Sequence, residues 1–322
     1  MKDIELLPQS GRFYKANLHS HTVLSDGKMT PEQAKKAYQE QGYSILAYTD
    51  HRHYGWHPEL CDENFIALAA FEVDNNSPLA EDGSYDRVKT YHMNFYDTDP
   101  VAHGGFEAHN PEFAYGDITA LNAYVADLKQ KGFLACYNHP YWSLQNYDDY
   151  KELNGFDFME IYNHGCEIDG LYGWNPQSYD EVLRTGRHLG CFATDDNHNC
   201  APFGDPYCDS FGGFTMLKLE KLTYEEVIHA LKNGNYYAST GPEIHSLVLK
   251  DGAVHVKCSP CEKIYMITEG RHTQSVMAKN GKLEEEAVFT LDGKEGYIRI
   301  ECRDNKGGRA CSRAYFLTEF ED

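Results

Sequence analysis

Three short segments of the chain place histidine beside aspartate in patterns that suit metal binding. They read NLHSHT at 17–22 with SDG at 25–27, TDHR at 49–52, and DDNH at 195–198. Imidazole nitrogens and carboxylate oxygens are common ligands of divalent transition metals in proteins. Together the segments supply enough of both for more than one ion, and a metal-dependent hydrolase is the first hypothesis.

Strands must position these groups. The runs 12–18 and 44–49 are rich in apolar and aromatic residues, which is typical of strands in a covered sheet. Side chains alternate along a strand, so His19 and His21 project to the same side and both imidazoles can bind one ion. A single one of the 16 histidines would indicate little, because surface histidines are common. The repeated pairing with aspartate just past a predicted strand favours a metal site.

The order of the motifs resembles a known family. His-x-His-Thr at 19–22, Ser-Asp-Gly at 25–27, Thr-Asp-His at 49–51, Asn-His-Pro at 138–140 and Asp-x-His at 196–198 are similar to the motifs of the polymerase and histidinol phosphatase (PHP) family of metal-dependent phosphoesterases. The resemblance covers about residues 13–240. It implies a distorted (β/α)7 TIM-like barrel with up to three metal ions at the C-terminal ends of its strands, where barrel enzymes keep their chemistry.

The resemblance also implies nine ligands, each a histidine or carboxylate, for two or three divalent ions. The first ion would be held by His19, His21 and Asp196, and it would share Glu72 with the second ion. The second ion would also be held by His92 and His139, and the third by Asp26, His51 and His198. The implied catalytic residues within this set are Glu72, Asp196 and His198. The family often has a small residue where this chain has Asp195, which leaves open whether Asp195 or Asp196 is the ligand. Arg52, beside a ligand, and His164, just past a predicted strand, are the candidates for binding a substrate phosphate.

A mechanism follows from such a cluster. Two ions that share a carboxylate and lie ~3.5–4 Å apart can hold one water between them and lower its pKa toward neutrality. The resulting metal-bridging hydroxide would attack phosphorus in line with the leaving oxygen, while the ions neutralise charge on the other oxygens. Mixed imidazole and carboxylate ligands suit zinc first, with manganese or iron as alternatives.

The remaining pattern up to residue 240 predicts an α/β barrel. Seven strand-like runs alternate with helical signals, which implies a parallel sheet. The runs are 12–18, 44–49, 65–71, 90–96, 134–137, 156–162 and 189–193, and the helices are expected after Thr30, over Thr119–Lys131, after Ser178 and after Thr223. Thr30 with Gln33 reads as a capping box.

Residues 241–322 differ in pattern and predict a second domain. Short alternating runs are separated by the turn dipeptides Asp251-Gly252, Asn280-Gly281 and Asp292-Gly293, which are hairpin signals. We therefore expect a barrel over 1–240 and a small all-β, immunoglobulin-like sandwich over 241–322. Cys258 and Cys261, with Cys302 and Cys311 further on, superficially suggest a zinc site. The sequence does not favour one, because the second pair lacks the usual spacing.

Charge and cysteine content limit the classes of substrate and partner, and the cellular compartment, that the sequence suggests. The formal net charge is −21, and residues 241–322 hold 12 basic and 14 acidic residues, so nearly all of the acidic excess lies in the predicted barrel. An acidic barrel disfavours long nucleic acids and favours a small phosphorylated substrate. Ten cysteines without an apolar leader, and no long apolar run, predict a reduced, cytoplasmic protein without membrane partners. The pattern does not indicate an oligomeric state.

Two other classes of protein remain as alternatives. An amidohydrolase-type C–N hydrolase would use similar histidines, but it commonly carries a carboxylated lysine at a strand end, and none is predicted here. A non-catalytic, metal-containing binding protein would need only four closed ligands for a structural ion, whereas nine are available. A metal-dependent phosphoesterase is therefore the preferred prediction.

Overall fold

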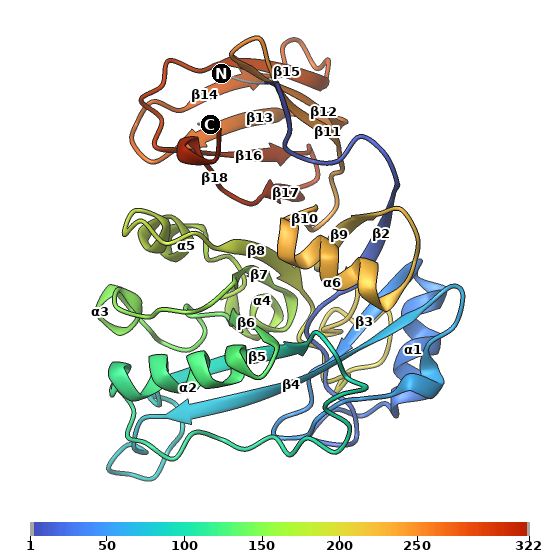
Figure 1. Ribbon diagram of the computed structural model, residues 1–322, viewed down its shortest axis with the longest axis vertical. Helices are drawn as coiled ribbons and strands as arrows, with labels where there is room; N and C mark the ends of the chain where they lie inside the picture. The colour runs from blue at the N-terminus through green and yellow to red at the C-terminus, as the bar shows by residue number, and fades with distance from the viewer. Residues whose placement is uncertain (1–2, 321–322) are drawn as a thin grey trace.

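The strands form two sheets, which the computed structural model describes over residues 3–320. Figure 1 shows the helices and long strands in the lower part of the molecule and an all-β part above, where both ends of the chain lie. The larger sheet is mixed and contains 14 strands, and the smaller has four, in the order β1-β11-β12-β15. The fold is therefore α/β, with a large mixed sheet and few helices.

The lower part carries nine strands of the larger sheet and all six α-helices. The strands are β2 (Arg12–Asn17), β3 (Tyr43–Tyr48), β4 (Ile66–Asn76), β5 (Thr90–Asp97), β6 (Phe133–Tyr137), β7 (Phe158–Asn163), β8 (Gly190–Thr194), β9 (Phe214–Leu219) and β10 (Tyr236–Ser239). The helices are α1 (Pro31–Glu40), α2 (Ile118–Gln130), α3 (Tyr147–Tyr150), α4 (His164–Gly170), α5 (Pro176–Leu183) and α6 (Tyr224–Asn233), with a 3₁₀ turn, η1, at Pro58–Leu60.

A closed (β/α)7 barrel is not confirmed. Strands β2, β3 and β4 run parallel, β5 is antiparallel to both β4 and β6, and β6, β7 and β8 run parallel again. Within residues 3–320 no ladder joins β8 to its neighbour β9. Instead, the Thr215 hydroxyl donates to the carbonyl of Ala193 at 3.0 Å and accepts from its N–H at 3.2 Å. The sheet is open at this point, and a side chain links its two edges.

The helix-start signals of the sequence are largely confirmed. Thr30 caps α1 in a complete capping box with Gln33, and Thr223 caps α6. The expected start at Ser178 is wrong, because α5 begins earlier, at Pro176 after Asn175. Proline suits the first helical position, where its missing N–H costs nothing.

The upper part contains the remaining strands of both sheets. They are β1 (Ile4–Glu5), β11 (Ile244–Lys250), β12 (Ala253–Cys261), β13 (Lys263–Thr268), β14 (Gln274–Met277), β15 (Glu284–Thr290), β16 (Tyr297–Arg303), β17 (Arg309–Ser312) and β18 (Tyr315–Phe316), followed by a 3₁₀ turn, η2, at Leu317–Phe320. An apolar core that includes Leu247, Val256, Ile264 and Ile300 fills the space between the two sheets. An immunoglobulin-like arrangement is not confirmed.

The two parts are joined by more than a linker. Strand β10 of the lower part pairs with β17 of the upper part. Within the upper part, β1 from the start of the chain pairs with β11. Arg299, which is 2% exposed, also donates from Nε and Nη2 to the carboxylate of Asp180 on α5, at 2.8 Å each. The division into 1–240 and 241–322 stays a prediction, and these contacts cross it.

Candidate metal centre

The ends of the strands bring all nine predicted ligands together. His19 and His21 follow β2, His51 follows β3, and His139 follows β6. The other five are Asp26, Glu72, His92, Asp196 and His198. Each of the nine has an imidazole nitrogen or carboxylate oxygen within 4.0 Å of a ligand atom of another.

Glu72 is the centre of the group. It lies inside β4 and is 1% exposed, yet its two oxygens contact five imidazoles. The distances to the nearest nitrogens are 3.1 Å to His51, 3.1 Å to His92, 3.3 Å to His21, 3.4 Å to His19 and 3.9 Å to His139. A buried carboxylate among so many imidazoles is suited to bridging metal ions.

Asp196 forms a second focus of the cluster. Its Oδ1 lies 3.0 Å from Nε2 of His19 and 3.0 Å from Nε2 of His21, and its Oδ2 lies 3.6 Å from Nε2 of His139. The Nε2 atoms of His19 and His21 are 3.2 Å apart. The first predicted group of ligands is therefore compact.

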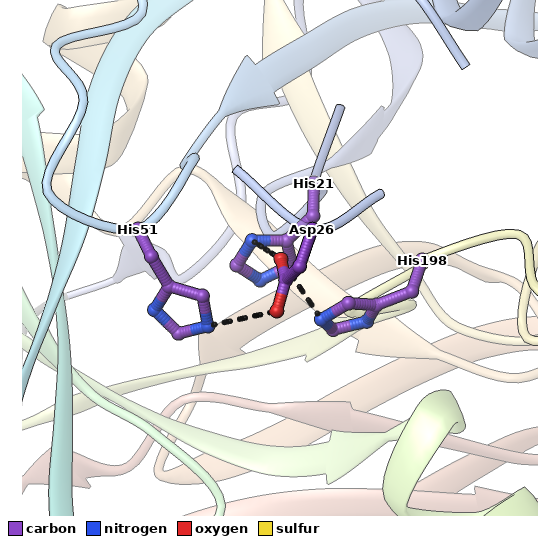
Figure 2. A group of neighbouring side chains, drawn as sticks. All are labelled: His21, Asp26, His51 and His198. Carbon is purple, nitrogen blue, oxygen red and sulfur yellow. Dashed lines mark ion pairs between the residues drawn. The ribbon is translucent and has the colours of Figure 1, made fainter. Parts of the chain in front are cut away.

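Figure 2 shows Asp26 beside three histidines, His21, His51 and His198. Asp26 is the most exposed of these four residues, so they form the outer group of the cluster. Its oxygens lie 3.5 Å from Nε2 of His198, 3.7 Å from Nδ1 of His21 and 3.8 Å from Nε2 of His51. One ligand atom from each of these four residues lies within 4.8 Å of the others. His21 thus stands between this group and that of Asp196.

The donor set fits divalent ions on geometry and on unmet hydrogen bonding. Ligand atoms about 2.1 Å from one tetrahedral ion lie roughly 3.4 Å apart, which is the separation found here. His51 Nδ1, Glu72 Oε2 and His139 Nε2 are buried and have no hydrogen-bond partner. The first two are 3.1 Å apart without forming a hydrogen bond. Buried polar atoms rarely stay unpaired, and a cation held by these residues would satisfy all three.

Hydrogen bonds on the outer side of the rings orient the imidazoles. His19 Nδ1 is 2.7 Å from Glu160, His139 Nδ1 is 3.2 Å from the Ser143 hydroxyl, and His198 Nδ1 is 3.1 Å from the carbonyl of Asp196. A proton held at Nδ1 leaves the lone pair of Nε2 directed into the cluster. The ring orientation therefore favours metal binding through Nε2.

The electrostatics of the cluster keep its carboxylates ionised. Burial opposes ionisation of Glu72, but the imidazoles of His19, His92 and His51 hold the pKa of Glu72 well below its usual range. The pKa of Asp196 is likewise low despite burial, because of His19 and His21. Burial lowers the pKa of His51 to about 4, so this imidazole is neutral at pH 7. Despite burial, neighbouring carboxylates raise the pKa values of four other imidazoles, those of His19, His21, His92 and His198. A cation bound by these rings would displace their protons.

Strained backbone gathers at the same place. Arg52, His139, Asp196 and Asn199 have φ angles of 55°, 23°, 53° and 59°, in the left-handed region that non-glycine residues avoid. Such conformations cost roughly 1–3 kcal/mol each and cluster at functional sites. The fold therefore holds the candidate ligands His139 and Asp196, and the neighbouring Arg52, in backbone conformations that non-glycine residues disfavour.

Glu160 is a functional residue that sequence reasoning missed. This fully buried carboxylate on β7 accepts from the His139 N–H at 3.1 Å, the Asn163 side chain at 2.9 Å and the Thr194 hydroxyl at 2.7 Å, in addition to its contact with His19. The available signal was a lone acidic residue inside the apolar run at 158–163. Glu160 fixes the orientation of two ligands without pointing into the cluster.

The structure separates the roles of the two adjacent aspartates. Asp196 points into the cluster, whereas Asp195 accepts from the backbone N–H groups of Phe211, Gly212 and Gly213 at 2.7–2.9 Å. Asp195 also accepts from the Tyr38 hydroxyl at 2.7 Å. Asp195 therefore holds the 211–213 loop, and Asp196 is the residue with ligand geometry.

A cleft of about 810 Å³ opens over the cluster. Arg52 lines it and is half exposed, while its Nη1 donates to Asp74 at 2.7 Å. Trp142, Tyr85 and Tyr207 also line the cleft. His164 is not among the lining residues; its Nδ1 is 2.9 Å from the Tyr162 hydroxyl. Of the two predicted phosphate-binding residues, the structure places only Arg52 in the cleft.

Cys166 is a further ligand-type residue beside the cluster. It is buried on α4, lines the cleft, and lies with its sulfur within 4.8 Å of ligand atoms of His139 and Asp196. Burial raises the pKa of its thiol well above the usual range. Its sulfur is a further ligand-type atom at the edge of the cluster.

Comparisons with known proteins give matches among solved structures alone: no protein-family model matches, and no curated protein matches. A two-domain protein from Bacteroides vulgatus containing a predicted PHP-like metal-dependent phosphoesterase is 15% identical, with coverage of 95% of each chain and a TM-score of 0.49. A proposed metal-dependent phosphoesterase from Bifidobacterium adolescentis is 15% identical over 68% of this chain and 96% of that one, with a TM-score of 0.41. An amidohydrolase from Chromobacterium violaceum with bound sulfate and no metal is 15% identical over 59% of this chain and 89% of that one, with a TM-score of 0.37.

Within residues 3–320, no helix is both long and apolar enough to cross a membrane.

Proposed function

We propose that the chain is a metal-dependent phosphoesterase that hydrolyses a small phosphorylated metabolite. The observation that carries the proposal is the convergence of nine ligand-type residues in one cluster around Glu72, Asp196 and Asp26, with three buried ligand atoms left without hydrogen bonds. The order of the motifs, similar to that of PHP phosphoesterases, supports phosphorus as the reacting centre.

Divalent ions, when bound by these residues, supply Lewis-acid stabilisation of the phosphoryl oxygens and lower the pKa of water. We assign zinc, manganese or iron to the centre, because imidazole and carboxylate ligands suit all three. Two ions would share Glu72, and a third would be held by Asp26, His51 and His198.

The side chains of the protein have distinct tasks in this proposal. Glu72 supplies the negative charge that keeps cations close together. Asp196 would bind a metal ion together with His19 and His21. His198 lies beside Asp26 in the outer group, and we assign it the side facing the leaving group. Glu160 keeps the proton of His19 on Nδ1.

Substrate size and charge follow from the cleft. Its volume of about 810 Å³ exceeds what a free phosphate needs and suits a drug-sized metabolite. Arg52 offers a half-exposed guanidinium to a phosphate oxygen, and Asp74 holds that guanidinium at the cleft wall. Trp142 presents an aromatic face to the organic part of the substrate.

Hydrolysis of chromogenic substrates tests the proposal. The purified chain, supplied in turn with Zn²⁺, Mn²⁺ and Fe²⁺, is assayed with p-nitrophenyl phosphate, bis(p-nitrophenyl) phosphate and a set of dipeptides. We expect turnover of at least one phosphate ester, abolished in His51→Ala and retained in the control His245→Ala, whose exposed ring lies on β11. Cleavage of dipeptides without phosphate-ester turnover would contradict the proposal.

A further inference from the structure

Strand β12 breaks its own alternation beside two cysteines. Val254, Val256 and Cys258 are buried in the regular every-second pattern, but the next buried residue is Cys261, three positions on. In a regular strand, positions three apart face opposite sides. The β12–β15 register shifts between Lys257 and Cys261, and this bulge turns Cys261 to the same side as Cys258.

A third cysteine reaches the same point from the opposite sheet. Cys302 lies on β16, where it pairs with Ile264 of β13 and Ala310 of β17. The sulfur atoms of Cys258, Cys261 and Cys302 all lie within 4.8 Å of one another. Their exposed fractions are 3%, 0% and 0%. The group therefore spans the two sheets inside the apolar core.

Three other buried cysteines, which lie apart from both clusters, provide a comparison within the same chain. Cys136, Cys191 and Cys311 are equally buried, but none of them belongs to a ligand-type group within residues 3–320. Cys311 is on β17, the strand next to Cys302, and still lies outside the group. Isolated buried thiols are ordinary small apolar residues, whereas three that converge through a bulge form a donor set.

We propose that Cys258, Cys261 and Cys302 bind one soft monovalent metal ion, Cu(I), between the two sheets. Three sulfurs at ~2.3 Å from one ion lie about 4 Å apart, which is within the observed limit. Soft thiolate ligands select Cu(I). Zn²⁺ asks for a fourth ligand, and no histidine or carboxylate of residues 3–320 joins the group.

The bulge also provides access to this site. Pro260 is exposed and Ser259 is half-buried, so the segment between the two cysteines of β12 reaches the surface. An ion would pass at this end of the strand rather than through the core. Binding would release thiol protons to solvent, with no change in the oxidation state of sulfur or metal. The site is independent of the proposed phosphoesterase centre.

Metal titration of the full chain tests the inference. Reduced protein, with its histidine centre first saturated with Zn²⁺, is titrated anaerobically with Cu(I) in competition with a chromogenic chelator. We expect wild type to take one equivalent more than Cys261→Ala or Cys302→Ala, and Cys311→Ala to match wild type. Equal uptake by wild type and Cys261→Ala would overturn the inference.

X-ray absorption at the copper edge of the wild-type protein gives a result that does not depend on the folding of a variant. We expect three sulfur neighbours at ~2.3 Å. A first shell of nitrogen or oxygen would overturn the inference, as would a disulfide between two of these three cysteines in protein isolated anaerobically. Phosphoesterase turnover is measured in parallel and should be unchanged in Cys261→Ala.

Discussion

The lower and upper parts of the molecule bury different kinds of side chains between or beside their strands. The end of the lower sheet buries Glu72, Glu160 and several imidazoles almost completely, whereas the space between the upper sheets holds aliphatic, aromatic and sulfur groups. Burying a charge costs several kcal/mol per ion unless it is paired. The comparison teaches that the largest group of buried charges lies at the candidate site of the lower part, whereas the buried Arg299 of the upper part is paired with Asp180 and Glu301 at the junction.

The largest expected effect is at Glu72. Glu72→Gln keeps the size of the side chain but removes the charge that draws the cations together, so turnover should fall by about a thousandfold, roughly 4 kcal/mol of transition-state stabilisation. Steady-state assays with the best chromogenic ester measure this, and the exposed Glu63→Gln is the matched control. Because ligands of one centre act as a unit, adding His139→Ala should reduce turnover little further. Full additivity of the two changes would argue against a shared centre.

The next effect concerns the junction between the parts. Asp180→Asn leaves the buried Arg299 guanidinium without its bidentate carboxylate, and the free energy of unfolding should fall by about 3 kcal/mol. Urea unfolding measures the change, while kcat should stay near the wild-type value because the pair is remote from the cleft. A loss below roughly 0.5 kcal/mol, as for an ordinary surface change, would show that the two parts do not depend on this contact.

Glu160 tests whether an orienting carboxylate matters as much as a ligand. Glu160→Gln should lower metal affinity and kcat by about 10–100-fold, which is typical when the outer partner of a metal-bound histidine is removed. Bound metal and turnover are measured together, and Glu160→Asp should restore part of both. Wild-type metal affinity in Glu160→Gln would reduce this residue to a packing role.

The smallest effect is expected at the cleft wall. Arg52→Met should raise KM for a phosphomonoester about tenfold, or roughly 1.4 kcal/mol, with kcat largely retained. His164→Ala should leave KM unchanged, since His164 does not line the cleft. An increase in KM for His164→Ala and none for Arg52→Met would reverse the two assignments.

Most of the candidate site was predictable, because its residues occupy short motifs just past predicted strands. His19, His21 and His51 follow predicted strands directly, and the rest of the ligand set came from the resemblance of the motifs to those of a known family. Glu160 was missed because its signal is one carboxylate in an apolar run, and its partners His19 and His139 come from distant segments. Which of Asp195 and Asp196 faces the cluster depends on the 211–213 loop, and therefore on tertiary structure.

The fold was predictable locally and less so globally. Capping residues located α1 and α6, and turn dipeptides separated the upper strands. Strands β1, β9 and β10 lie outside the seven runs predicted up to residue 240, and the barrel was expected to close. Closure depends on the register between segments far apart in the chain, which local patterns do not encode. The bulge that groups Cys258 with Cys261 interrupts the alternation of buried and exposed residues along β12. Like barrel closure, it depends on register between strands and is not encoded in a local pattern.

Metal content measured together with turnover tests the central claim most directly. Protein purified without added metal is analysed by elemental mass spectrometry, treated with a chelator, and then reloaded with one metal at a time. The account predicts two or three ions per chain at the histidine centre, loss of phosphoesterase turnover when they are removed, and recovery on reloading. Undiminished turnover by metal-free protein, or the absence of bound divalent metal from the active protein, would contradict it.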